Sequence, residues 1–334
     1  MKFGEIPVVE ARGAITAHAV KIAGLVLRKG HEITAQDQAA LTAAGVANVV
    51  AARLEPGDVH EDLAASTLAE HLAGPGLRRE KPFTGRVNLF ARVPGLVKVD
   101  VAAIDAINQL DEAITVATLS AYKFVAEGDM AATVKIIPFA ANGASMAAAQ
   151  AVPGARGAVA IAPFRPSRVA VVSTLLPGLK ASVVAKTLAV LEGRLAPCGA
   201  SIAAETRVPH ATAELAEAVQ AAARRADLVV VFGASAITDR RDVIPGAIEL
   251  AGGRIEHFGM PVDPGNLLLV GEVQGKPIIG APGCARSPKE NGFDWVLQRL
   301  LADVPIGRKE IQAMGVGGLL MEISTRPQPR TGDE

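Results

Sequence analysis

The residues best suited to chemistry lie in three polar loops, each of which follows an apolar segment in the second half of the chain. The loops cover residues 173–180, 233–242 and 281–292. Their small residues let backbone N–H groups approach a ligand, and the helix start expected after each loop favours an anion. The pattern predicts a site for an anionic, for example phosphorylated, small molecule. Its candidate binding residues are Ser173, Thr174, Gly233, Ala234, Ser235, Pro282, Gly283, Arg286, Ser287 and Lys289.

Four charged residues in these loops each have two interpretations. Asp239 either holds a metal ion or an activated ligand, or forms a salt bridge with the arginines beside it. Asp242 precedes a helical segment, so it is either a catalytic residue or a helix cap. Arg286 and Lys289 either contact an anion or lie on an ordinary solvated surface. Asp239 and Asp242 are therefore the catalytic candidates, and Asp239 is the candidate metal ligand.

Several familiar sites are absent from the sequence. No Gly-x-Gly-x-x-Gly follows a strand, and no phosphate-loop lysine occurs. Two cysteines, Cys198 and Cys284, are too few for a disulfide framework or a four-thiolate zinc site. The six histidines, at positions 18, 31, 60, 71, 210 and 257, lack metal-ligand spacing, so we interpret them as structural or surface residues.

The elements that must position the loops follow from the apolar pattern after residue 167. Buried-type strands are expected over residues 168–173, 200–208 and 227–232, and helices over 181–195, 211–225, 242–250 and 293–301. Residues 267–280 form a hairpin with Gln274 and Gly275 in the turn. Alternating strands and helices predict an α/β fold with a doubly wound, mostly parallel sheet, in which ligands bind outside the carboxyl ends of the strands.

The first half of the chain reads as a mixed α+β region. Thr34 is a candidate cap of a helix that ends near Gly45, residues 46–54 are strand-like, and 60–72 and 101–110 are helical. A strand is expected over residues 134–139, and a linker rich in Ala, Gly and Pro over 140–166. The expected domains are residues 1–165, 166–306 and a C-terminal tail, 307–334.

Composition excludes several classes of protein. The chain of 334 residues has 34 basic and 34 acidic side chains and only 3% aromatic residues, which argues against nucleic-acid binding. The longest uncharged stretch, residues 136–155, contains prolines, glycines and amides that a membrane helix would hardly tolerate together. With no signal-peptide pattern at the start, we expect a cytoplasmic protein without a membrane segment. The oligomeric state, including a homo-oligomer, stays open.

Three segments resemble loops of the molybdenum-cofactor biosynthesis fold shared by molybdopterin adenylyltransferases and molybdotransferases. Its Gly-Gly-x-Ser/Gly loop and later acidic residue are matched by residues 232–235 with Asp239 and Asp242. Its Pro-Gly element before the hairpin is matched by residues 260–266, and its Gly-x-Pro-Gly loop by 280–283. The resemblance spans residues 165–305 and adds Pro264, Gly265 and Asn266 to the candidate binding residues.

The first half is similar to the same family. Residues 29–37 and 44–46 resemble the molybdotransferase segment that precedes the cofactor fold. Residues 132–139 and 259–266 resemble the molybdopterin-binding half of bacterial bifunctional proteins that also carry a nucleotidyltransferase domain. This resemblance implies a nucleotidyltransferase on another chain as a partner.

The resemblance also implies a ligand and roles for the candidate residues. The ligand is molybdopterin or its molybdenum form, with Mg²⁺ as a cofactor of any catalysis. The implied roles are phosphate or pterin contact for Gly233 and Ser235, cation or oxyanion contact for Asp239 or Asp242, phosphate charge balance for Arg286 and Lys289, and recognition of pterin edges for Asn266 and Ser287.

Two departures from the family pattern bear on the reaction. Phe232 replaces the first glycine of the Gly-Gly pair, which predicts a narrower pocket mouth, and Leu175 and Leu176 replace an acidic stretch after the Ser-Thr pair. The leading hypothesis is therefore a protein that binds molybdopterin and hands it to a nucleotidyltransferase. The alternative is a catalytic molybdotransferase or adenylyltransferase-like enzyme using Mg²⁺. A third hypothesis is a structural or regulatory module with an empty pocket.

Overall fold

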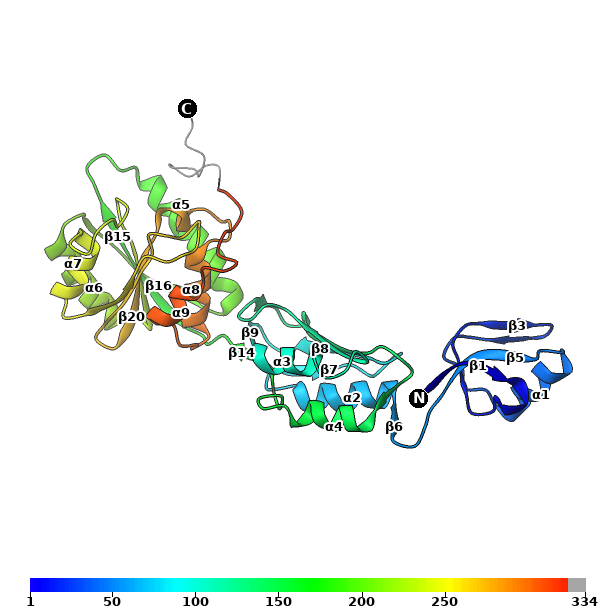
Figure 1. The fold of residues 1–334 in the computed structure, drawn as a ribbon. Coiled ribbons are helices and arrows are strands. Elements are labelled where there is room, and N and C mark those ends of the chain that lie inside the picture. Colours follow the sequence, from blue (N-terminus) through cyan, green and yellow to red (C-terminus); the bar gives the residue numbers. More distant parts are fainter. Residues whose placement is uncertain (324–334) are drawn as a thin grey trace, which may run out of the picture. The chain divides into compact units, whose positions relative to one another are not determined.

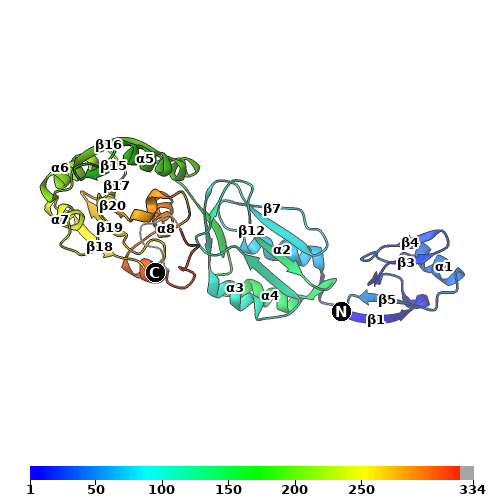
Figure 2. The ribbon, with the colours of Figure 1, turned by 90° about the horizontal axis from the view of Figure 1, so that it is seen from above.

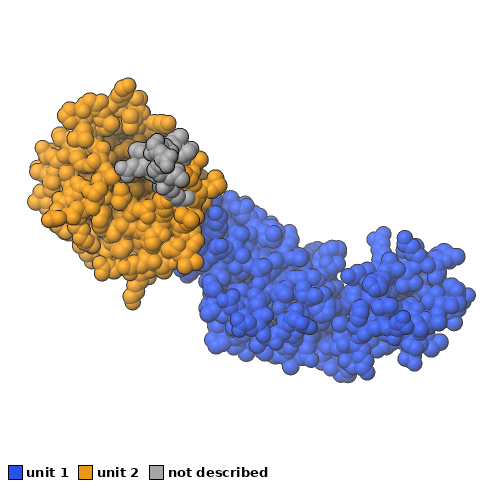
Figure 3. Space-filling view, turned by 45° about the horizontal axis from the view of Figure 1, so that its top comes forward, with its two compact units in different colours: residues 1–93, 97–161 blue, residues 94–96, 162–334 orange. Residues whose placement is uncertain are grey.

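The chain divides into two compact units. The computed structural model describes residues 1–323, so residues 324–334 of the expected tail lie outside the described part. Unit 1 comprises residues 1–93 and 97–161, and unit 2 comprises 94–96 and the residues from 162 onward (Figure 3).

The beginning of unit 1 has a small core of its own. The short antiparallel sheet has the order β1-β5-β2, and β3 and β4 form a separate hairpin. Thr34 caps α1 in a reciprocal arrangement with Asp37, which confirms the predicted helix start. The elements are β1 (Lys2–Pro7), η1 (Val8–Glu10), β2 (Ile15–Thr16), β3 (Val20–Ile22), β4 (Leu25–Leu27), α1 (Ala35–Ala43) and β5 (Asn48–Arg53).

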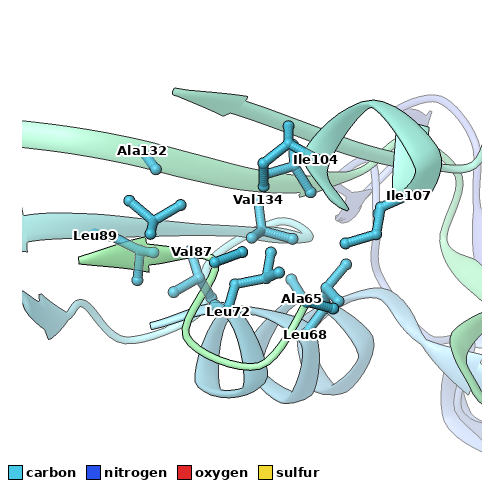
Figure 4. Packing of buried hydrophobic residues seen from close by; sticks show 14 of the residues in the cluster. Ala65, Leu68, Leu72, Val87, Leu89, Ile104, Ile107, Ala132 and Val134 are labelled. Atoms are coloured by element: carbon cyan, nitrogen blue, oxygen red, sulfur yellow. The ribbon is translucent and has the colours of Figure 1, made fainter. Parts of the chain in front are cut away.

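The larger part of unit 1 is built around helix α2. Leu68 and Leu72 of α2 are fully buried and pack with Val87 of β8 and Val134 of β12 (Figure 4). The sheets have the orders β10-β12-β8-β7, β11-β9-β14 and β13-β6. The elements are β6 (Asp58–His60), α2 (Glu61–Leu72), β7 (Leu77–Arg79), β8 (Arg86–Ala91), β9 (Gly95–Val99), α3 (Val101–Asn108), β10 (Ile114–Thr118), β11 (Phe124–Val125), β12 (Met130–Ile136), β13 (Ala140–Asn142), α4 (Gly143–Ala151) and β14 (Val159–Pro163).

The predicted linker over residues 140–166 is wrong. This stretch contains β13, α4 and β14, and Asn142 caps α4 by accepting a hydrogen bond from the N–H of Ala144. Met146 and Ala149 are buried in the core of unit 1. The Ala and Gly residues that predict a linker by composition instead allow close packing of a helix.

Unit 2 contains a six-stranded sheet of order β16-β15-β17-β20-β19-β18 (Figure 2). The first four strands are parallel, while β19 runs antiparallel to both of its neighbours. The elements are β15 (Arg168–Leu175), α5 (Ala181–Leu195), η2 (Ala196–Cys198), β16 (Ser201–Pro209), α6 (Thr212–Ala223), β17 (Leu228–Phe232), α7 (Val243–Leu250), β18 (Arg254–Phe258), β19 (Leu269–Val273), β20 (Lys276–Ala281), η3 (Gly283–Arg286), α8 (Gly292–Leu301) and α9 (Arg308–Gln312).

Helices cover both faces of this sheet, which confirms the predicted fold class (Figure 1). Helices α6 and α7 share a core with Val172 and Val231 on one face, and on the other face Phe293 of α8 packs near Phe232 of β17. The expected strands, helices and hairpin are present within a few residues of their predicted bounds. The strand β18 was not predicted, because it lies at the edge of the sheet and none of its residues is buried.

No helix within residues 1–323 is long and apolar enough to cross a membrane. The uncharged stretch 136–155 is divided among β12, β13 and α4.

The core of unit 1 gives a stability prediction. Leu72 on α2 is fully buried, so Leu72→Ala should lower the free energy of unfolding by about 2–5 kcal/mol through lost contacts and a residual cavity. Urea unfolding followed by circular dichroism measures this change. Leu63→Ala on the same helix, where Leu63 is 62% exposed, is the control and should change stability by less than about 0.5 kcal/mol. Equal effects of the two substitutions would contradict this packing.

Candidate functional site

The candidate site lies where the carboxyl ends of β15 and β17 meet. The chain leaves β15 for α5 on one face of the sheet and leaves β17 for α7 on the other, so these adjacent strands form a topological switch point. Ser173 is paired in register with Phe232, and both Ser173 and Thr174 are buried. The Thr174 hydroxyl accepts a hydrogen bond of 2.8 Å from the N–H of Ala234. This bond joins the first predicted loop to the second.

Gly233 is required by the turn that follows β17. A Cβ atom at this position would lie 2.7 Å from the carbonyl oxygen of Ser235 and 2.8 Å from Cδ1 of Ile244. Any side chain would therefore force the turn away from α7. The small residue satisfies internal packing, and its contact with a ligand stays a prediction.

Arg286 brings a positive charge to this turn. Its Nη2 donates a hydrogen bond of 2.9 Å to the Gly233 carbonyl, and its Nη1 donates one of 2.7 Å to the Thr187 hydroxyl of α5. The guanidinium lies over the ring of Phe232, 5.3 Å from its centroid. Burial lowers the pKa of Arg286, and no carboxylate of the described residues pairs with it. The site thus contains a partly buried cation that no carboxylate within residues 1–323 neutralises.

A second arginine holds the loop that carries Arg286. The Arg194 side chain of α5 forms a hydrogen-bonded ion pair of 2.5 Å with Asp294 of α8. It also donates to the carbonyl oxygens of Ala285 and Ser287 at 2.8 and 2.6 Å. The third predicted loop is therefore fastened between α5 and α8. Lys289 lies exposed on this loop, and its N–H donates to the Ser287 hydroxyl.

The predicted residues before the hairpin lie at the same edge of the sheet. Pro264 accepts a hydrogen bond from the N–H of Gly292 at the start of α8. A Cβ on Gly265 would lie 2.8 Å from that same nitrogen, so the two segments pack backbone to backbone. Asn266 is exposed, and its amide donates to the Met260 carbonyl at 3.4 Å.

Pro282 and Gly283 connect β20 to the turn η3. Pro282 is buried, whereas Gly283 is exposed and has no atom within 4 Å of where a Cβ would lie. The Asn266 side chain hydrogen-bonds to Met260 rather than to Pro282 or Gly283 among the described residues, so these predicted binding residues lie on separate segments of one edge of the sheet.

The two catalytic candidates make local contacts. Asp239 is exposed and forms an ion pair of 2.8 Å with Arg241, which lowers the pKa of Asp239 to about 2. Asp242 caps α7 by accepting hydrogen bonds from the N–H groups of Val243 and Thr238. The non-catalytic alternatives predicted from the sequence are thus both present: Asp239 forms a salt bridge, and Asp242 caps a helix. The catalytic roles of these carboxylates stay predictions.

A magnesium ion at Asp239 has little support from the surrounding residues. No group of three or more metal-binding side chains occurs in residues 1–323. A single exposed carboxylate already paired with a guanidinium is a poor ligand set for a cation that prefers several oxygen ligands. We therefore derive no reaction step through Mg²⁺.

His210, which directly follows β16, is a further residue of the site that was not among the predicted ones. Its Nδ1 lies 2.8 Å from the Thr174 hydroxyl, and its Nε2 lies 3.1 Å from the Ser235 hydroxyl. The spacing of the histidines, which does not suit a metal site, predicts only structural or surface roles for them. The rule that selects carboxyl ends of strands would have found His210, because it is the first residue after the strand beside β15.

Two segments of the chain match known protein families. Residues 168–302 match the family described as "Probable molybdopterin binding domain". These residues lie within unit 2. Residues 5–53 match a second family, a domain of unknown function, and no curated protein matches the chain.

Three solved structures are among those similar to parts of this chain. The molybdopterin biosynthesis protein MoeA from Pyrococcus horikoshii is 15% identical over 90% of this chain and 75% of its own, with a TM-score of 0.33. A CinA protein of unknown function from Thermoplasma acidophilum is 20% identical over 36% of this chain and 90% of its own, with a TM-score of 0.27. A molybdenum cofactor biosynthesis protein from Pyrococcus furiosus is 11% identical over 91% of this chain and 64% of its own, with a TM-score of 0.27.

Phe232 is buried and so does not narrow a pocket mouth, contrary to the expectation from its bulk. Its side chain is 1% exposed, and its ring centroid lies 6.4 Å from that of Phe293. The ring forms part of the core and supports the Arg286 guanidinium by a cation–π contact. Leu176, in place of an acidic residue, is 47% exposed in the β15–α5 loop.

The anchoring of the third loop gives a stability prediction for unit 2. Arg194→Ala leaves the half-buried Asp294 without its partner, and we expect a loss of about 3–5 kcal/mol in unfolding free energy. Urea unfolding measures this loss of unfolding free energy. Arg254→Ala, at an exposed ion pair, is the control and should lower the unfolding free energy by less than about 1 kcal/mol. A similar loss in both variants would show that Arg194 does not fasten the loop.

Proposed function

We propose that this protein binds molybdopterin during molybdenum-cofactor biosynthesis, at the carboxyl edge of the sheet in unit 2. The family match of residues 168–302 supports the class of ligand. The observation that carries the proposal is the Arg286 guanidinium, which is desolvated at this edge and has no carboxylate partner among the described residues.

A phosphate monoester suits the free donors of Arg286. A guanidinium has five N–H groups, and hydrogen bonds to Gly233 and Thr187 use two of them. The remaining donors favour a planar, doubly hydrogen-bonded contact with phosphate oxygens. Such an anion would also neutralise the guanidinium charge, which burial otherwise makes costly. The phosphate of molybdopterin is the group we assign to this position.

The start of α5 supports an anion at the same edge. Lys180 precedes this helix and provides no side-chain cap, so the first N–H groups of α5 are not satisfied by a capping side chain. Helix N-termini favour negative charge. Asn266 and Ser287, exposed and half-buried respectively, are the proposed contacts of the pterin ring.

Binding without turnover is favoured over the catalytic alternative by the engagement of Asp239 and Asp242. Asp239 is neutralised by Arg241, and Asp242 is used as a helix cap. The proposal therefore assigns the reaction to another protein, a molybdopterin nucleotidyltransferase that receives the pterin. The form of the pterin, with or without molybdenum, is part of the test below.

Pterin retention tests the proposed site. The chain is purified without oxygen from a host that makes the cofactor, the pterin is oxidised to its fluorescent product, and bound molybdenum is measured alongside. Arg286→Gln should reduce retention by about tenfold or more, because a hydrogen-bonded charge contact is lost. Arg224→Gln is the matched control, since Arg224 is exposed at the end of α6, at the opposite edge of the sheet. Undiminished retention in Arg286→Gln would refute the proposal.

The same preparations separate carrier from enzyme. Adenylylated molybdopterin is incubated with the chain, Mg²⁺ and molybdate, and release of the nucleotide is followed. A protein that only carries molybdopterin leaves the adenylylated molybdopterin unchanged. Turnover that Asp239→Ala abolishes, in a variant that still retains pterin, would replace the carrier hypothesis with the molybdotransferase or adenylyltransferase-like alternative.

A further inference from the structure

His210 connects the ends of three neighbouring strands at the candidate site. It follows β16, its Nδ1 lies 2.8 Å from the Thr174 hydroxyl of β15, and its Nε2 lies 3.1 Å from the Ser235 hydroxyl after β17. Thr174 is 1% exposed, whereas Ser235 is exposed. The three side chains thus run from the interior of the sheet edge to its surface.

The direction of these hydrogen bonds follows from the Thr174 hydroxyl. Its oxygen already accepts the N–H of Ala234 at 2.8 Å. A buried hydroxyl proton needs an acceptor, and among the described residues Nδ1 of His210 is the acceptor within reach. Thr174 therefore donates to Nδ1, which leaves the proton of the neutral imidazole on Nε2. That N–H donates to the Ser235 oxygen.

We propose that Thr174, His210 and Ser235 form a donor chain whose last O–H, on Ser235, binds an anionic phosphate oxygen. His210 is its positioning residue. Because the Ser235 oxygen accepts from His210, its own proton is free to point outward. The proposal rests on the proposed function and deepens it by adding His210 as the residue that orients the Ser235 hydroxyl, for which the family resemblance implies a phosphate or pterin contact.

This direction excludes a second chemistry that the same residues suggest. A nucleophilic serine needs a histidine nitrogen without a proton to accept its hydrogen. With the proton on Nε2, His210 cannot act as that base. Ser235 is then a hydrogen-bond donor for a ligand oxygen, and successive donors in one direction strengthen one another.

Nitrogen NMR of the full chain, labelled at its histidines, tests the direction. The His210 signal is identified by its loss in His210→Gln, and the proton is expected on Nε2. A proton on Nδ1 would overturn the proposal. So would covalent labelling of Ser235 by a serine-directed phosphonate.

Binding of inorganic phosphate, followed by NMR of the same protein, tests the contact itself. Ser235→Ala and His210→Ala should each weaken it by about tenfold. His210→Gln should restore most of the affinity, because the glutamine amide can accept from Thr174 and donate to Ser235. Ser201→Ala is the control, since Ser201 is exposed at the beginning of β16. Equal affinity in Ser235→Ala and the wild type would overturn the proposal.

The two proposals fail separately. A chain that retains no pterin, yet binds phosphate through Ser235, would refute the proposed ligand and keep the donor chain. A chain with the proton on Nδ1 and pterin retention that depends on Arg286 would refute the donor chain alone.

Discussion

The strand order of unit 2 is the constraint on which the candidate site depends. The connection from β15 to β16 leads to one side, and the connection from β16 to β17 returns past β15 to the other. Since such connections are right-handed, the reversal places successive helices on opposite faces. The loops that follow β15 and β17 consequently leave toward opposite faces of the sheet. Thr174 and Gly233 meet there, although they are far apart in the sequence.

Two arginines at this edge of the sheet differ in whether a carboxylate neutralises their charge. Arg194 is neutralised by Asp294 and has hydrogen bonds to three carbonyl oxygens, so its charge serves to hold the loop. Arg286 has a carbonyl, a hydroxyl and an aromatic ring as partners, and none of these carries a negative charge. The first arginine thereby positions the second, whose charge has no carboxylate partner within residues 1–323 and so supports the proposal of an anionic ligand.

Much of the fold could be predicted because its signals are local. The strands of unit 2 are short apolar segments, and its helices have an apolar face and identifiable ends. The predictions of secondary structure failed in two segments whose conformation depends on tertiary packing rather than on local composition. The small residues of α4 were interpreted as a linker although a capped, partly buried helix forms there, and the polar strand β18 gains its place by pairing with β19.

By itself, the sequence determined the α/β class of unit 2 and the three loops at its sheet edge, because apolar periodicity and the carboxyl-end rule depend on near neighbours. The tertiary structure decided what each side chain contacts. His210 lies 36 residues from Thr174 and 25 from Ser235, and Arg286 lies 53 residues from Gly233. Hydrogen bonds over such separations depend on strand order and register, which no local pattern encodes.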